Sequence, residues 1–597
     1  MYLKTLSLEN FRSFKSNSIS FQPDITILVG ENNSGKSNAI DAIRLLTPPL
    51  SSRREIYCQL TDIRFDAGNE FEVSALYSDL TDSQQGRLMT ASTDETMTEV
   101  RFGLTYDQSK GSYPPRPDLW GGMKGQQPER GCHDMIRHVY LPALRDAKYA
   151  LASGNPTRIY ALLRHFLGEK DHDTVAKELA RGAEHELLQT IGASVDVGLE
   201  ALTGGVRQQI ASLGFSKDEK LIDIARDLKF SLADHGIVPE DLSYSGHGYA
   251  NLLYMATIAV ELESVNNAEL TIFLVEEPEA HLHPQLQSAV LAFLKEQAIK
   301  SRKTQPENGA PAGEIQVVVA THSPNLTASV ASQNTVFLRS LAFEGVGERE
   351  NGPEGEPTSV TPRRESRSIA LAELLDDPKQ QRKIDRYIDV TKASFLFGGR
   401  MLLVEGIAEA LLLPLLAEKF VLDGDESAKR RFRSAAFIPI DGVDFEPYIR
   451  LLITQQNDVR IADKVVIVTD GDGPRTYETG LTPGQTRKAN YDEIAVASGA
   501  EELCITIINT YSLETELLIA GNGDILKNAY LKIHPQSGDK WDAVVAHNGD
   551  ELAKQMHELF KDARKGDFAQ ALAELIEDGE AFEVPDYLAE AIKAIVE

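Results

Sequence analysis

Residues 402–410 read LLVEGIAEA, and residues 465–472 read VVIVTDGD. Each is an apolar run, typical of a buried strand, that ends in carboxylates. These carboxylates are Glu405 and Glu409 in the first segment and Asp470 and Asp472 in the second. Four carboxylates at the ends of two buried strands would repel one another unless a cation lay between them. The segments therefore predict a site for Mg²⁺ or Mn²⁺, because clustered oxygen ligands suit these ions better than zinc.

The composition bounds the class of protein. The chain has 597 residues, 42% hydrophobic and 25% charged, as in soluble globular proteins, with room for about three or four domains. The three cysteines are far apart and form neither a zinc spacing nor a disulfide framework, which indicates a reducing, cytoplasmic location. The apolar runs are shorter than a membrane span, so we expect no membrane partner.

The formal net charge of −29 argues against a protein that coats DNA through bulk charge. Contact with nucleic acid would need local basic patches. Two candidate patches are Arg430, Arg431 and Arg433, and Arg363, Arg364 and Arg367. Each cluster taken alone is more simply interpreted as solvated surface charge.

Residues 30–37 read GENNSGKS and match the phosphate-binding pattern G-x-x-x-x-G-K-[ST]. The apolar run ITILV precedes them and NAIDAIRLL follows, which predicts the required strand, turn and helix. Backbone N–H groups would surround phosphate oxygens, with Lys36 at the β- and γ-phosphates and Ser37 on magnesium. The predicted nucleotide contacts are Gly30, Glu31, Asn32, Asn33, Ser34, Gly35, Lys36, Ser37 and Asn38.

Two later strands end in residues suited to ATP hydrolysis. Residues 272–279 read IFLVEEPE, where Glu276 would lie by the magnesium ion and Glu277 would polarise the attacking water. His322 follows the run VVVAT. A histidine there could be a core residue whose ring nitrogens are hydrogen-bonded. Because it follows the segment that ends in Glu276 and Glu277, which fits a Walker B element, it is typical of a γ-phosphate sensor.

Residues 242–248 read LSYSGHG, which resembles a degenerate ABC signature. Its Ser245, Gly246 and Gly248 would contact the γ-phosphate of a nucleotide held by a second subunit. The ordered motifs resemble the ABC-type ATPases of the SMC, Rad50 and RecF group. That resemblance implies that Arg12, in the opening LENFRSF, lies near the nucleotide and that the protein forms a homodimer or pairs with another ATPase.

The pattern along the chain predicts an α/β protein with two ATPase segments around an insert, followed by a second α/β domain. The predicted boundaries are 1–150 and 236–375 for the ATPase, 151–235 for the insert and 390–597 for the second domain. The insert is expected to be helical, because apolar residues from Val175 to Leu213 recur at roughly helical spacing. It would serve either as a dimer contact or as core. Residues 344–367 are polar and Gly-rich, which predicts a loop or linker.

The segments LLVEGIAE and IVTDGD resemble a Toprim domain, the metal-binding fold of topoisomerases, primases and some nucleases. Further segments are YSLETELL (511–518), with Glu514 and Glu516, RKGDFA (564–569), with Lys565, and VYLPALRDA (139–147). Together with the ATPase motifs they resemble the OLD (overcoming lysogenization defect) nucleases. This resemblance implies that Glu514 and Glu516 add metal ligands and that Lys565 stabilises the pentavalent phosphate. It also implies an ATP-regulated, metal-dependent DNA endonuclease, in a family associated with anti-phage defence.

Other functions stay open at this stage. A repair-type ATPase with an inactive C-terminal domain would bind DNA and never cut it. A topoisomerase would need a nucleophilic tyrosine in a DNA-gate domain, and a primase commonly carries a zinc module that three scattered cysteines cannot build. The residues are compatible with ATP either driving or restraining cleavage, and with control by a protein or nucleic-acid regulator from the same operon.

Overall fold

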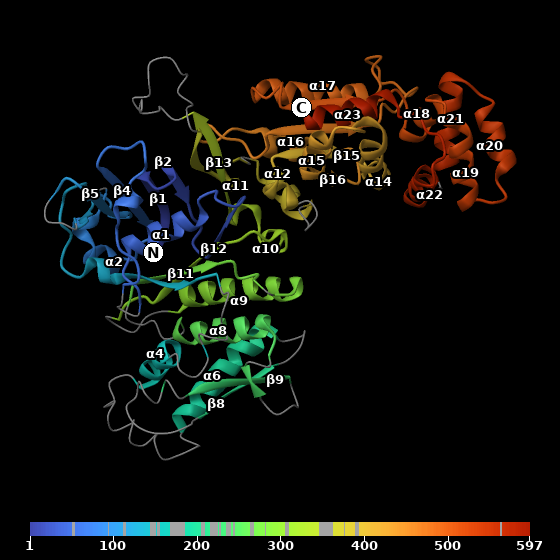
Figure 1. The fold of residues 1–597 in the computed structure, drawn as a ribbon. Helices are drawn as coiled ribbons and strands as arrows, with labels where there is room; N and C mark the ends of the chain where they lie inside the picture. The colour runs from blue at the N-terminus through green and yellow to red at the C-terminus, as the bar shows by residue number, and fades with distance from the viewer. Residues whose placement is uncertain are drawn as a thin grey trace, which may run out of the picture. The chain divides into compact units, whose positions relative to one another are not determined.

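The structure is a computed structural model of the chain. It describes residues 1–50, 54–93, 95–110, 115–143, 151, 156–167, 186–203, 209–214, 225, 228–234, 240–242, 245–262, 268–280, 282–304, 310–344, 362–374, 377–387, 393–561 and 564–597. The chain divides into two compact units, Met1–Ala370 and Leu371–Glu597. Each unit contains a largely parallel sheet with helices packed on it, which confirms the α/β class (Figure 1).

A six-stranded sheet with the order β14-β13-β3-β12-β11-β7 forms the centre of the first unit. Its strands are β3 (Ile25–Val29), β7 (Ile136–Leu141), β11 (Leu270–Glu276), β12 (Glu314–Ala320), β13 (Thr335–Glu344) and β14 (Pro362–Ala370). All five residues of β3 are buried, as expected for a central parallel strand covered on both faces. The predicted helix after it is α1 (Lys36–Leu46), so the expected strand, turn and helix are confirmed.

A second sheet in this unit is antiparallel, with the order β2-β1-β4-β5-β6. Its strands are β1 (Tyr2–Phe11), β2 (Phe14–Ser20), β4 (Glu70–Ser78), β5 (Val100–Asp107) and β6 (Asp118–Gly121), and α2 (Asp82–Arg87) follows β4. Apolar side chains of α1, of this sheet and of β11 share one core. Gln316 of β12 links the two sheets, because its buried amide accepts from Leu3 N at 2.8 Å and donates to Leu3 O and Gln22 O at 2.9 Å.

The predicted helical insert is only partly helical. Its described elements are α4 (Pro156–Leu167), α6 (Glu186–Thr203) and a small sheet of β8 (Gln209–Gly214), β9 (Lys229–Asp234) and β10 (Glu240–Asp241). Ile210 and Leu213 lie on strand β8, so their assignment to a helix is wrong. Apolar residues three positions apart can occur in a strand as well as in a helix when apolar residues are sparse. Pairing with a neighbouring strand then decides which of the two forms. Val175, Leu179 and Val206 lie outside the described residues.

Helices join this insert to the central sheet. They are α8 (His247–Leu262), α9 (Pro284–Lys303) and the short α10 (Pro324–Ala328). Helix α9 packs on β12, and α6 packs against α8 and α9 (Figure 1). The insert therefore packs on helices that follow the signature-like and Walker B segments.

The polar stretch predicted as a linker is in part a strand. Residues 362–370 form β14, which pairs antiparallel with β13 at the edge of the six-stranded sheet. Arg363 and Arg364 are exposed on it. Charged side chains on an edge strand discourage pairing with other chains, which explains a composition that resembles a linker. Residues 345–361 lie outside the described part.

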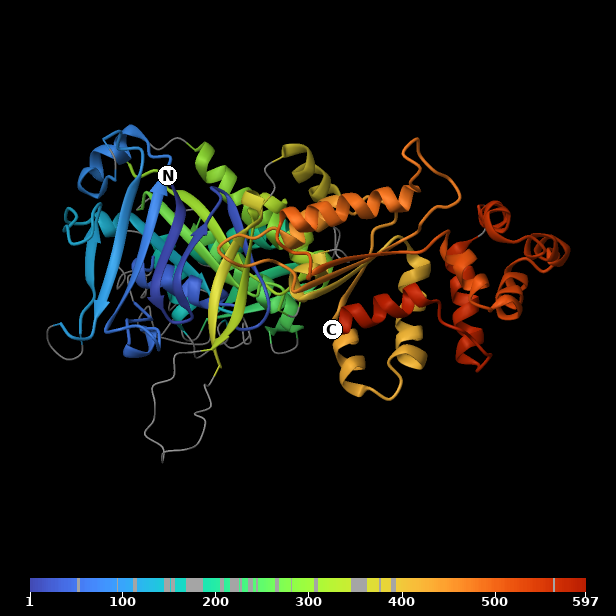
Figure 2. The same cartoon turned by 90° about the horizontal axis from the view of Figure 1, so that it is seen from above.

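The second unit has a four-stranded parallel sheet with the order β16-β15-β17-β18. Its strands are β15 (Arg400–Val404), β16 (Ala436–Pro439), β17 (Lys464–Thr469) and β18 (Cys504–Ile508). Helices α16 (Glu446–Ile453) and α17 (Pro483–Ala497) lie on one face, and α14 (Ile407–Leu416) and α23 (Asp586–Val596) on the other (Figure 2). The chain leaves β15 toward β16 on one side and later adds β17 on the other. This reversal between β15 and β17 is where open α/β sheets bind ligands.

The remaining helices of this unit extend its core. They are α11 (Leu371–Leu374), α12 (Pro378–Tyr387), α15 (Glu426–Ser434), α18 (Leu513–Ile519), α19 (Gly523–Ile533), α20 (Gly538–Val545), α21 (Gly549–Phe560) and α22 (Lys565–Glu577). Helix α22 packs against both α14 and α19. A late segment of the chain thus lies beside the helix that follows β15. In the described part of the chain, no helix is both long and apolar enough to cross a membrane.

The bond between the two sheets of the first unit leads to a stability prediction. Gln316→Ala should lower the free energy of unfolding by about 2–4 kcal/mol, because it leaves three backbone groups, two of them buried, without their partner. Gln285→Ala, an exposed position on α9, should change it by less than about 0.5 kcal/mol. Calorimetric unfolding of both variants checks this, and equal transitions would contradict the role of Gln316.

Candidate functional site

The phosphate-binding loop has the backbone shape that its sequence predicts. Gly30 has φ 146°, Gly35 has φ 105° and Asn33 has φ 62°, all left-handed. A Cβ on Gly30 would lie 2.1 Å from Leu338 O, so only glycine fits there. The loop leads directly into the N-terminus of α1, whose unpaired N–H groups favour an anion.

Lys36 lies inside this loop. Its ammonium donates to Gly30 O at 2.8 Å and to Glu31 O at 2.9 Å. Burial lowers its pKa to about 8, although Glu277 and Glu279 act in the opposite direction. Its other contact is the Ser34 hydroxyl at 3.4 Å, so the buried cation has only neutral partners and gains when phosphate oxygens replace them.

The strand ends on either side of the loop converge because the strands are in register. Leu28, Ala320 and Glu276 lie in one row of β3, β12 and β11. Glu276 accepts from Tyr140 Oη at 3.1 Å and from Ser37, and burial raises its pKa. The two predicted magnesium contacts, Ser37 and Glu276, are therefore neighbours.

The predicted γ-phosphate residues lie at the same edge. His322 Nε2 is 3.8 Å from Glu277 Oε1, and burial and Lys36 lower the His322 pKa. Glu277 has φ 45°, a left-handed conformation for a residue with a side chain. Glu279, which the motif analysis left without a role, accepts from Thr321 Oγ1 at 2.7 Å and from His322 N at 2.8 Å. It thus fixes the loop that carries His322.

Arg12 lies beside α1. Its guanidinium contacts Asp62 and Asp41, each at 2.8 Å, and Asn38 at 3.2 Å. The structure therefore brings together Arg12 and Asn38, two of the predicted nucleotide contacts. Ser245, Gly246 and Gly248 lie at the start of α8, while residues 243 and 244 of the signature-like segment, and residues 144–147 of VYLPALRDA, are outside the described part.

The carboxylates of the second unit lie at the carboxyl ends of neighbouring strands. Val404 is level with Val468, and Thr469 with Ile508, so β15, β17 and β18 end together. Glu405 follows β15, and Asp470 follows β17, the two strands that flank the reversal of the sheet. Glu409 lies in the first turn of α14 and Glu514 in the first turn of α18. The acids that were far apart in sequence are close in space.

Burial and mutual repulsion dominate the electrostatics of this acidic cluster, which we define as Glu405, Glu409, Asp470 and Glu514. Burial, then the charges of Glu405 and Glu514, raise the pKa of Glu409 to about 7. The pKa of Asp470 is raised well above its usual range, first by burial and then by the negative charges of Glu405, Glu409 and Glu514. Burial also raises the pKa of Glu405. An added cation would relieve each of these costs.

Lys565, predicted from a segment near the end of the sequence, joins the cluster. It is the first residue of α22, and its Nζ lies 2.9 Å from Glu514 Oε1. Burial lowers its pKa, but Glu514, Asp470 and Glu409 more than offset this, so the pKa is raised. The lysine is therefore charged at neutral pH and stands among the carboxylates.

Two other predicted ligands have different surroundings. Glu516 Oε1 accepts from Thr510 N at 3.0 Å and Tyr511 N at 3.1 Å, which fixes the turn before α18. Asp472, at φ 56°, is partly exposed and paired with Arg487 at 2.9 Å. The contacts of Glu516 are those of a turn-stabilising group, and Asp472 lies at the rim of the cluster.

The donor set fits a divalent cation, although the spacing of a closed metal site is not preformed. All candidate ligands are carboxylate oxygens, and more acids than bases are buried together. In the part of the chain that the structure describes, no three His, Cys, Asp or Glu residues already stand as a metal-binding group. Two basic side chains, Lys565 and Arg487, are in contact with the acids instead.

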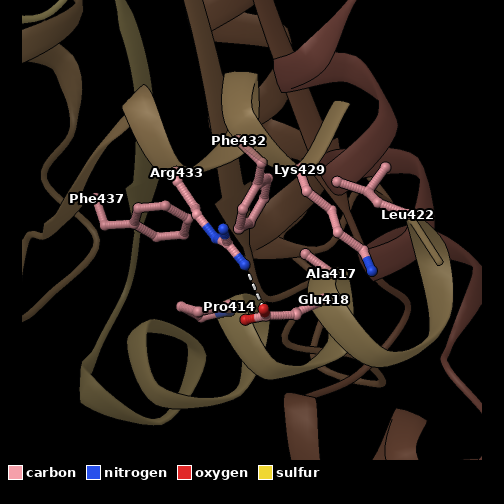
Figure 3. A pocket seen from close by; sticks show the side chains of 8 residues that line it. All are labelled: Pro414, Ala417, Glu418, Leu422, Lys429, Phe432, Arg433 and Phe437. Carbon is pink, nitrogen blue, oxygen red and sulfur yellow. Dashed lines mark hydrogen bonds and ion pairs between the residues drawn. The ribbon is translucent and has the colours of Figure 1, made fainter. Parts of the chain in front are cut away.

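A separate cavity of about 230 Å³ lies elsewhere in this unit (Figure 3). It is lined by Pro414, Ala417, Glu418, Leu422, Lys429, Phe432, Arg433 and Phe437. Pro414 lies near the C-terminal end of α14, whereas Glu409 lies in its first turn. The cavity therefore lies toward the opposite end of that helix from the acids. Arg433, one of the basic residues singled out in the sequence, points across it to an ion pair with Glu418.

Comparisons with known proteins agree with both halves of this arrangement. A model of the AAA ATPase domain matches residues 1–107 and 185–327, and a model of the overcoming lysogenization defect protein-like Toprim domain matches residues 396–472. The Old nuclease of Escherichia phage P2 is 26% identical over 443 residues, 70% of each chain. The chain therefore combines an ATPase domain with an OLD-like Toprim domain, and it matches the ATPase–Toprim fusion of the OLD family.

Other similarities are more limited. A RecF DNA replication and repair protein of Gloeothece citriformis is 43% identical over 53 residues, 9% of this chain and 14% of that protein. A crystal structure of an Smc head bound to the C-winged helix domain of ScpA aligns with 63% of this chain and 100% of its own, at 18% identity and a TM-score of 0.42.

Sequence patterns missed several residues that surround the acidic cluster. Thr469 donates its hydroxyl to Glu405, and Asn509 donates to Asp470 Oδ1 at 2.7 Å while accepting from Gly471 N at 2.7 Å. Tyr587 of α23 is buried near Asp470, and burial raises the pKa of its hydroxyl. Arg487 of α17 contacts both acidic segments. Only Thr469 and Asn509 had a usable signal, since each ends or follows a predicted strand.

The raised pKa of Glu409 leads to a prediction for metal-free protein. Between about pH 4.5 and about pH 7 the folded state holds a proton that the unfolded chain has released. The free energy of unfolding should therefore fall as the pH rises through this window. Glu409→Gln should remove roughly 3 kcal/mol of that fall. Urea unfolding across the window in the presence of a chelator checks this, with exposed Glu590→Gln as the control. Identical pH slopes for the wild type and Glu409→Gln would refute the assignment.

Proposed function

We propose that this chain is an ATP-binding and ATP-hydrolysing, divalent-metal-dependent DNA endonuclease. The observation that carries the proposal is the convergence of Glu405, Glu409, Asp470, Glu514 and Lys565 from four separate segments. They meet beside the reversal point of a sheet in an OLD-like Toprim domain. The name of the phage P2 relative, Old nuclease, supports the same activity.

Each residue of the cluster has a separate task in this proposal. Glu405, Glu409, Asp470 and Glu514, with Asp472 at the rim, would hold one or two Mg²⁺ or Mn²⁺ ions. The chemistry supplied by such ions is activation of water and neutralisation of charge on the scissile phosphate. Lys565 would place its ammonium beside the same phosphate, where negative charge grows in the transition state. Asn509 and Thr469 hold Asp470 and Glu405 in position.

The ATPase residues would control access to this site. Lys36 and the loop N–H groups would bind the phosphates, Ser37 and Glu276 the magnesium ion, and Glu277 and His322 would act at the γ-phosphate. Ser245, Gly246 and Gly248, at the start of α8, would complete the nucleotide site of a second subunit, so we propose a homodimer. The family link alone supports a cytoplasmic role in anti-phage defence, with a protein or nucleic-acid regulator.

The acidic cluster is tested by its own removal. Glu405→Ala and Asp470→Ala should each slow Mg²⁺- or Mn²⁺-dependent nicking of plasmid DNA by at least about 100-fold, since even residues that only orient metal ligands contribute about 10- to 100-fold. Lys565→Ala should slow it by about 100- to 1000-fold. Exposed Glu590→Ala and Lys561→Ala are the matched controls. Cleavage that persists in the first three variants would remove the site, and DNA binding without cutting in any divalent metal would favour a repair-type ATPase.

Lys36→Ala tests the nucleotide site and the direction of control. It should weaken ATP binding by about 10- to 100-fold, the effect of losing one charge-assisted contact to phosphate. If bound ATP restrains the nuclease, the variant should cut faster than the wild type at saturating ATP, whereas if hydrolysis drives cutting it should be inactive. Equilibrium binding of a fluorescent ATP analogue and nicking assays with and without ATP measure both effects. Unchanged ATP affinity would refute the assigned role of Lys36.

A further inference from the structure

Arg487 of α17 contacts both acidic segments of the second unit. Its Nη1 donates to Asp472 Oδ2 at 2.9 Å. Its Nη2 donates to the carbonyl oxygen of Asp470 at 2.6 Å, to Thr469 Oγ1 at 3.1 Å and to Glu405 Oε1 at 3.4 Å. The side chain is 16% exposed, so its charge is poorly screened by water.

The fold places this guanidinium firmly. Helix α17 begins against the Asp470–Asp472 loop, where Gly484 N donates to Gly471 O at 3.1 Å. A Cβ on Gly484 would lie 2.4 Å from Asp470 O, so only glycine allows this close approach. Thr482 caps the helix through Gln485 N at 3.2 Å. Arg487 follows within the next turn and is directed back at the loop.

The contacts of Glu405 show which groups the arginine satisfies. Glu405 Oε1 accepts from Asp470 N at 2.9 Å, from the Thr469 hydroxyl and from Arg487. Two of these donors are neutral and belong to the strand end itself. Arg487 adds a full positive charge, and it extends to Asp472, a carboxylate at the rim that is 43% exposed. The guanidinium thus neutralises oxygens that a divalent cation would also bind.

We propose that Arg487 is an internal counter-cation that holds Asp472 and Glu405 in the metal-free state and releases Asp472 when a divalent cation binds. This inference rests on the proposed metal site. The exchange replaces one ion pair by metal coordination, so the arginine lowers the affinity for the ion and stabilises the empty site. A purely structural arginine would have the opposite effect on affinity, because its loss would disorder the ligands.

The test uses the full chain and Ca²⁺ or Mn²⁺ alone, measured by calorimetric titration. Arg487→Gln should bind the ion about tenfold more tightly than the wild type, since a neighbouring unit charge is removed. Arg487→Lys, which keeps the charge, should stay within about threefold of the wild type. Arg475 is exposed and lies just after the Asp470–Asp472 loop, so Arg475→Gln removes an equal charge without breaking the contacts of Arg487. It should change the affinity for the ion by less than about twofold.

Thermal unfolding supplies a second readout. Without metal, Arg487→Gln should unfold at a lower temperature than the wild type, and saturating metal should remove most of that difference. Weaker or unchanged metal binding by Arg487→Gln would overturn the exchange. If the wild type itself took up no Ca²⁺ or Mn²⁺, the proposed metal site would fail first. A variant that lowered the unfolding temperature equally with and without metal would show a structural arginine only.

Discussion

Negative charge is buried where the parallel strands of the second unit end, and the second unit is organised around this constraint. Burial raises the pKa values of Glu405, Glu409 and Asp470 together, which means that the folded chain holds these acids at a cost. The structure offsets the cost with Lys565 and Arg487, one from the last part of the chain and one from the helix after the DGD loop. A protein selected for stability alone would replace such a cluster with apolar side chains, so its presence indicates a binding function.

Both units place their chemistry by the same geometric rule. In a parallel sheet every strand ends at the same edge, so residues distant in sequence meet there without long loops. The first unit brings the phosphate-binding loop, Glu276 and His322 together at the ends of β3, β11 and β12. The second brings Glu405 and Asp470 together at the ends of β15 and β17. In each unit a loop residue with left-handed φ follows a strand end, Glu277 in one and Asp472 in the other.

Local sequence patterns predict the acids that lie at or just after strand ends, and they give little signal for residues on later helices. Glu405 and Asp470 follow apolar runs whose ends are visible in the sequence, and their neighbourhood follows from parallel pairing. Glu514 and Lys565 could be assigned only through family resemblance, because nothing local distinguishes them from surface charge. Arg487 had no signal at all, since its role depends on Gly484 letting α17 approach the loop. The prediction of a helix through Ile210 and Leu213 was wrong for a related reason, because strand pairing depends on tertiary contacts.

In the proposed nuclease, the overall charge of the chain would link metal occupancy to substrate access. A formal charge of −29 repels a DNA backbone, and the acidic cluster adds the closest part of that repulsion. Lys565 and Arg487 offset only part of the buried negative charge, and both are already paired with acids. A phosphate group that entered before a cation would meet negatively charged carboxylates, because both basic side chains are already paired with acids. In the proposed nuclease, cations bound first would offset this negative charge and free basic groups for the phosphate, so on electrostatic grounds we expect metal binding to precede productive contact with DNA.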